Sequence, residues 1–207
     1  MDRATTATRR QLVSGLLALG GTAVGGTAVV GAAAGAARAE AVAAPQSDAD
    51  LVEEMLAAEL LAIAVYESVL GSGLLSPQPE HTARRALAQE RAHVRALRPV
   101  LEKLGGTMPT SPTGSSAVDR ALADRRITGR VEKLRTEHDC VSLLLDLESD
   151  VQSVYFKAMS KIENPGVMRL AAQIMANEAQ HATAISEARR PGDIGQAVPY
   201  AFVEGRH

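Results

Sequence analysis

The sequence predicts an all-α fold built as a four-helix bundle, and three observations support this prediction. Of the 207 residues, 46% are hydrophobic but only 2% are aromatic, and tryptophan is absent. The alternation of apolar and polar residues that is typical of half-buried strands is scarce. From Ser47 onward, apolar residues instead recur at helical spacing in four long stretches. The chain is long enough for one domain with a substantial core.

The first 39 residues are typical of an export signal rather than of a folded domain. Residues 8–13 (Thr-Arg-Arg-Gln-Leu-Val) resemble the twin-arginine motif, residues 12–37 carry no charge, and residues 37–39 (Ala-Arg-Ala) form a small-x-small cleavage site. We therefore expect a signal peptide over 1–39, a linker over 40–47, and export by the twin-arginine machinery. The alternative is an uncleaved membrane anchor through residues 12–37, because this run is long enough to span a bilayer.

The first two helices are predicted from their apolar periodicity and their end signals. Ser47 or Asp48 is a suitable N-cap for a helix that extends to about residue 70, where glycines follow. The second helix is expected from about Pro79 to Leu104. Pro99 should kink its last turns or end it early, because proline removes a helical hydrogen bond.

A connection over residues 105–135 separates the second long helix from the third. Residues 105–116 are rich in Gly, Pro, Ser and Thr, and a short helix is expected over 117–126. Connections between bundle helices usually take about 2–8 residues. This one is therefore long enough to cross from one end of the bundle to the other.

The third and fourth long helices are expected at about 136–162 and 165–189, which completes a bundle over residues 48–190. Asn164 followed by Pro165 is a good helix start signal, and Pro191 follows the expected end. The tail over 191–207 contains an apolar segment that could cover a hydrophobic edge or a subunit contact, so a homodimer is one expectation.

Glutamate and histidine residues interrupt the apolar faces of the four long helices. The first and third helices each carry a lone Glu, and the second and fourth each carry a Glu-x-x-His pair, whose members share one helix face. These six residues are Glu59, Glu90, His93, Glu148, Glu178 and His181.

The two halves of the chain repeat this pattern. In each half a tyrosine, Tyr66 or Tyr155, follows the lone Glu after seven residues. The Glu-x-x-His pair begins 31 residues after the lone Glu in the first half and 30 residues after it in the second. Such matched spacing indicates an internal duplication of a helical hairpin.

Burial explains why this pattern predicts a metal site. A carboxylate on the apolar face of a helix is costly to bury unless it is paired or binds a cation. Four uncompensated carboxylates in one core would repel one another or take up protons. Two divalent cations would balance their charge, and two neutral imidazoles would complete the coordination.

With these residues in place, the chain resembles the ferritin-like di-iron family, which includes rubrerythrin, bacterioferritin and manganese catalase. A Glu from each of two helices and a Glu-x-x-His pair from each of two others is the arrangement found in such bundles. The resemblance covers residues 48–189. It implies a ferritin-like bundle with a long crossover between helices 2 and 3, in which all six residues are metal ligands. Glu90 and Glu178 would be the bridging carboxylates.

The resemblance also gives the two tyrosines an expected role. Tyr66 and Tyr155 are similar to tyrosines that hydrogen-bond across such sites and support the catalytic centre from outside the ligand shell. The sequence has no Cys-x-x-Cys pair, so the rubredoxin-type electron-transfer domain of full rubrerythrins is missing and the electron donor is unidentified.

The resemblance implies redox chemistry at two iron ions, with Fe(II) oxidised by O2 or H2O2 as in a ferroxidase or peroxidase. One alternative is a di-manganese enzyme similar to catalase, and another is a bundle that binds metal without turnover or serves as an interaction module. Because the twin-arginine route carries folded proteins, a metal could be inserted before export.

Composition argues against several other functions. The formal net charge is −2 and no basic run contains interleaved aromatic residues, so nucleic acid is not an expected partner. The single Cys140 cannot form an intrachain disulfide. His81, His138 and His207 lie outside the repeated pattern and are expected at the surface.

Overall fold

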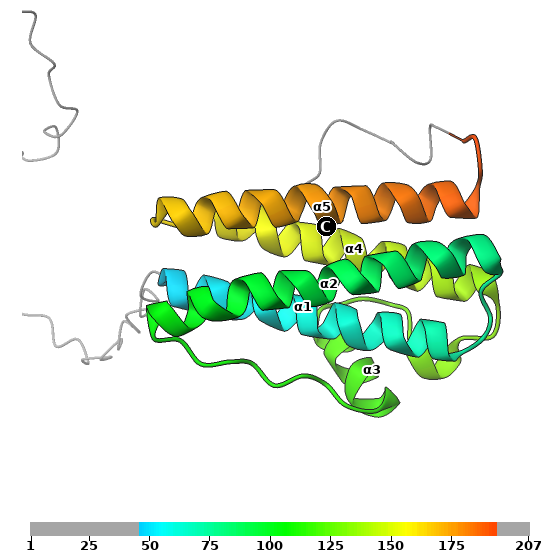
Figure 1. Cartoon of the computed structure of the whole chain (residues 1–207). Helices are drawn as coiled ribbons and strands as arrows, with labels where there is room; N and C mark the ends of the chain where they lie inside the picture. Colours follow the sequence, from blue (N-terminus) through cyan, green and yellow to red (C-terminus); the bar gives the residue numbers. More distant parts are fainter. Residues whose placement is uncertain (1–45, 194–207) are drawn as a thin grey trace, which may run out of the picture. The chain divides into compact units, whose positions relative to one another are not determined.

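A computed structural model describes residues 46–193, and within this range the secondary structure is entirely helical, as predicted (Figure 1). The predicted signal peptide and residues 194–207 of the tail lie outside the described residues. The helices are α1 (Asp48–Gly71), α2 (Pro77–Leu104), α3 (Ser115–Asp124), the short 3₁₀ helix η1 (Val131–Lys133), α4 (Glu137–Met159) and α5 (Pro165–Arg189).

The four long helices form the bundle, and each packs against two others. Helices α1 and α2 make one hairpin, and α4 and α5 make the second. The hairpins join through α1 against α4 and α2 against α5. The short helix α3 lies outside this group and packs against α1 (Figure 1). No helix within residues 46–193 is long and apolar enough to cross a membrane.

The connection between α2 and α4 runs along the bundle from one end to the other. Near its start, the backbone N–H of Thr107 donates to Glu53 Oε1 in the first turns of α1, at 2.5 Å. At its far end, Glu137 Oε2 at the start of α4 accepts from the N–H of Ser76, the N-cap of α2, at 2.5 Å. A helix of 28 residues such as α2 is about 42 Å long, and the connection spans this distance.

Matching caps begin the first helix of each hairpin. Ser47 and Asp50 form a reciprocal capping box at α1, and Thr136 and Asp139 form the same box at α4. Each box satisfies backbone donors that a helix start would otherwise leave without partners. The repeat that the sequence shows therefore extends to the way in which the two hairpins begin.

The predicted end of α2 at Leu104 is confirmed, and of the two effects expected of Pro99 the early end of the helix is wrong. Pro99 is exposed, whereas Leu97 and Leu101 on the same helix are 0% and 1% exposed. Burying two leucines contributes several kcal/mol, which offsets the hydrogen bond that the proline ring removes. Packing thus outweighs local propensity in the last turns of this helix.

Candidate metal centre

The fold brings all six predicted residues together in the centre of the bundle. The four glutamates are 0% exposed, and the two histidines are 7% and 3% exposed. They form two groups, in each of which one ligand atom per residue lies within 4.8 Å of the others. Glu90 and Glu178 belong to both groups; Glu59 and His93 complete the first, and Glu148 and His181 complete the second.

Both histidines turn Nδ1 toward the carboxylates. His93 Nδ1 lies 2.8 Å from Glu178 Oε1 and 3.3 Å from Glu59 Oε2. His181 Nδ1 lies 2.9 Å from Glu90 Oε1. The two rings stack with centroids 5.9 Å apart. The Nδ1 atoms are therefore the histidine nitrogens available to a metal in this cluster.

The two tyrosines link the hairpins through the lone glutamates. Tyr66 on α1 donates a hydrogen bond to Oε1 of Glu148 on α4, and Tyr155 on α4 donates to Oε1 of Glu59 on α1. Burial and the neighbouring carboxylates raise the pKa of both phenols well above the usual value, so both remain protonated donors. Each bond occupies one carboxylate oxygen and leaves Oε2 available on the side of the histidines.

Two amide residues, which the sequence analysis did not identify, hold the outer nitrogens of the histidines. His93 Nε2 lies 2.9 Å from Asn177 Oδ1, and His181 Nε2 lies 2.8 Å from Gln89 Oε1. Because each amide oxygen is an acceptor, Nε2 carries the proton and Nδ1 is left to bind a metal. The missed signal was the side-chain amide immediately before the Glu in both Glu-x-x-His motifs.

Replacing either amide by leucine is expected to weaken metal binding about 10–100-fold, which is the usual effect of losing a partner that orients a ligand. Gln89→Leu should release the ring of His181, and Asn177→Leu should release that of His93. Titration of the metal-free protein with Zn(II) measures the effect. Gln173→Leu, at an exposed position on α5, is the matched control. Equal affinities in all three variants would show that the amides do not position the histidines.

The carboxyl groups and imidazoles of the cluster shift one another's pKa values. Burial raises the pKa of Glu59 and of Glu148 well above the usual range. Burial opposes the charged form of both histidines, but hydrogen bonds to the carboxylates raise the pKa of His93 and of His181 to about 12. Burial also opposes ionisation of Glu90, yet hydrogen bonds from the imidazoles lower its pKa to about 2. A bound cation would take over the role of these imidazolium groups and release their Nδ1 protons.

The residues present fit a metal ion. Three buried carboxylate oxygens have no hydrogen bond of good geometry within residues 46–193 and lie beside an imidazole Nδ1 instead: Glu90 Oε1 at 2.9 Å, Glu178 Oε1 at 2.8 Å and Glu148 Oε2 at 3.7 Å. Oxygens of this kind are costly to bury unless they bind a cation. All three belong to residues of the two donor groups. Mixed carboxylate and imidazole donors suit iron, manganese and zinc.

The fold and the cluster together define a class: a helical bundle with a buried carboxylate and histidine site that could hold metal. Residues 47–190 match the family model described as the ferritin-like domain. The chain belongs to this ferritin-like family. No curated protein and no solved structure matches the chain significantly.

Proposed function

We propose that the cluster binds two metal ions, bridged by Glu90 and Glu178, and that the protein is an exported di-iron oxidoreductase. The observation that carries this proposal is the overlap of the two donor groups, which share these two glutamates and differ in the other ligands. A pair of shared carboxylates is what a dinuclear centre requires. The twin-arginine motif within residues 8–13 supports export, which fractionation of producing cells would test.

The charge of the site supports two divalent ions rather than one. Four carboxylates carry four negative charges, and two divalent cations balance them with neutral imidazoles at the remaining positions. One divalent ion would leave two negative charges to be balanced by protons on the cluster's own glutamates and imidazoles, in a core where all four glutamates are 0% exposed. Iron and manganese both accept this donor set, so a di-manganese catalase-like enzyme is the second candidate.

Bound iron would supply electrons in pairs, as two Fe(II) become Fe(III) and O2 or H2O2 is reduced. The chain's own residues hold the reacting centre. Tyr66 and Tyr155 fix the outer oxygens of the lone glutamates, while Asn177 and Gln89 fix the rings of the histidines. The burial of the cluster excludes bulk water and favours small oxidants over large substrates.

The decisive experiment mixes anaerobically Fe(II)-loaded protein with O2 or H2O2 and records the formation of Fe(III). We expect oxidation faster than that of free Fe(II) under the same conditions. Protein loaded with Mn(II) and mixed with H2O2 tests the second candidate, which predicts evolution of O2. Oxidation no faster than that of free iron, together with no evolution of O2, would reduce the proposal to metal binding without turnover.

A further inference from the structure

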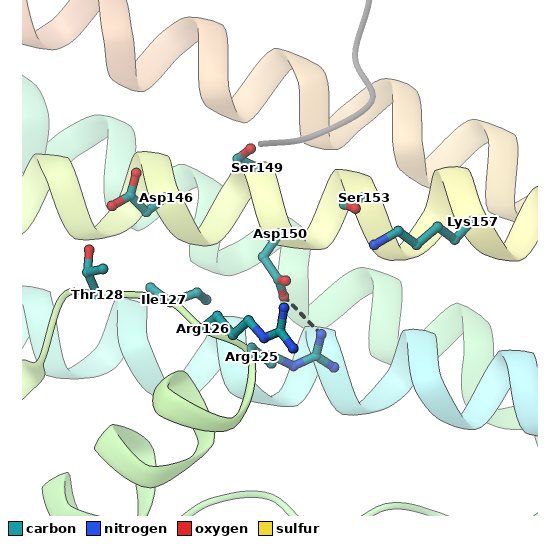
Figure 2. Close-up of a pocket in the computed structure, with 9 residues that line it drawn as sticks. All are labelled: Arg125, Arg126, Ile127, Thr128, Asp146, Ser149, Asp150, Ser153 and Lys157. Carbon is teal, nitrogen blue, oxygen red and sulfur yellow. Dashed lines mark hydrogen bonds and ion pairs between the residues drawn. The ribbon is translucent and has the colours of Figure 1, made fainter. Parts of the chain in front are cut away.

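A surface cavity of about 630 Å³ lies between the loop that follows α3 and one face of α4 (Figure 2). It shares no residue with the metal centre. Ligand-binding cavities usually have volumes of about 300–1,000 Å³. The lining residues are Arg125, Arg126, Ile127, Thr128, Asp146, Ser149, Asp150, Ser153 and Lys157.

The cavity has more positive than negative side chains. Arg125 is paired with Asp150, with Nη1 and Oδ2 2.9 Å apart. Arg126 and Lys157 are exposed, and within residues 46–193 neither side chain has a hydrogen bond or an ion pair. In Figure 2 the side chain of Arg126 reaches from the loop toward α4, and that of Lys157 lies along α4. With Asp146 as the remaining acid, the cavity has a net positive charge that favours an anionic ligand.

The hydroxyl of Ser153 also lines the cavity. The residue is 8% exposed, and its hydroxyl makes no hydrogen bond to any residue that the structure describes. Because this hydroxyl lies at the solvent-accessible wall of the cavity, it is free to bond to water or to a ligand. A ligand oxygen in the cavity would supply such a partner.

The backbone at Arg126 is held in the left-handed region, with φ of 62°. Among residues 46–193 it is the single non-glycine residue with positive φ. Glycine would adopt this conformation without steric cost. The conformation belongs to the C-terminal cap of α3, in which the N–H of Arg126 donates to the carbonyl of Ala123 and the N–H of Ile127 donates to that of Leu122. This cap places the Arg126 side chain at the wall of the cavity.

We propose that this cavity binds the phosphate group of a small molecule. A phosphate carries up to two negative charges, which match the two cations without partners, Arg126 and Lys157. Its oxygens accept from several directions, so the guanidinium fork, the ammonium and the hydroxyl of Ser153 can all donate. Asp150 holds Arg125 in place as a further cation at the same wall.

The test is titration of the metal-free full chain with inorganic phosphate, followed by calorimetry, so that the metal centre cannot contribute the signal. We expect saturable binding that Arg126→Gly weakens about tenfold or more, as the loss of a charge-assisted contact implies. Ser153→Ala should also weaken binding. Arg84→Ala removes a surface arginine that pairs with Glu80 on α2, and it should leave phosphate affinity unchanged.

Melting temperatures show whether Arg126 acts in phosphate binding or in stabilising the fold. Arg126→Gly removes the strain at φ 62°, so its melting temperature should equal or exceed that of the unaltered protein. Three outcomes would overturn the proposal: absence of saturable phosphate binding, equal phosphate affinity in Arg126→Gly and Arg84→Ala, or a lower melting temperature in Arg126→Gly.

Discussion

Glu90→Ala is expected to remove metal from both halves of the centre, whereas Glu59→Ala is expected to remove it from one half. Glu90 belongs to both donor groups and Glu59 belongs to one. Metal content per chain should therefore fall from about two ions to none in Glu90→Ala and to about one in Glu59→Ala. Metal analysis of protein purified from its native host measures both values. Glu178→Ala should behave as Glu90→Ala does, because Glu178 is the second shared residue.

The matched control for these variants is Glu67→Ala. Glu67 is an exposed glutamate on α1 that pairs with Arg91 at 2.7 Å and does not belong to either donor group. Its replacement should leave metal content unchanged. If Glu90→Ala and Glu178→Ala retain the metal content of the unaltered protein, the assignment of the site is wrong. If Glu59→Ala loses as much metal as Glu90→Ala, the two halves do not fill independently.

Removal of the metal is expected to lower the stability of the whole bundle. The cluster joins all four long helices, and within residues 46–193 three of its buried carboxylate oxygens lie beside an imidazole Nδ1 without a hydrogen bond of good geometry. Binding to the folded state alone stabilises it by about 4 kcal/mol when free metal exceeds Kd a thousandfold. For a domain of this size that corresponds to a rise in Tm of about 10 °C. Thermal unfolding with and without a chelator measures the difference.

The variant Glu90→Ala, which lacks a shared metal ligand, separates stabilisation by bound metal from any effect of the chelator on the protein itself. Glu90→Ala should unfold at the same temperature with and without added metal, because it lacks a donor in both groups. Because Glu90→Ala takes from His181 a carboxylate oxygen 2.9 Å from its Nδ1, the metal-free variant should be less stable than the metal-free unaltered protein, so the comparison is made within each protein, with and without metal. If the chelator lowers the melting temperature of Glu90→Ala as much as that of the unaltered protein, bound metal does not stabilise the bundle.

The helices and the members of the cluster could be predicted because their signals are local. Ser47 caps α1 and Asn164 caps α5, as their residue types indicate. A glutamate within the apolar stripe of a helix predicts a buried carboxylate, because that stripe is buried whichever helix it packs against. The Glu-x-x-His spacing places both side chains on one face before any packing is known. All six residues identified in this way lie together in the structure.

The features that could not be predicted depend on contacts between hairpins. Tyr66 was expected near the site, but its bond to Glu148, on the opposite hairpin, depends on how α1 packs against α4. Asn177 resembled any half-exposed amide until the packing of α2 and α5 brought it to His93. Arg126 was not singled out, because a positive φ at a non-glycine residue leaves no mark in the sequence.

The sequence by itself determined the helical class, the duplicated hairpin and the identity of six buried polar residues, because periodicity and spacing are properties of a single helix. Tertiary structure alone decided which amide holds which histidine, which glutamate each tyrosine reaches, and that Pro99 does not end α2 early. Each of these depends on atoms from two helices, or on burial against a neighbour, and such energies arise only when the hairpins pack together.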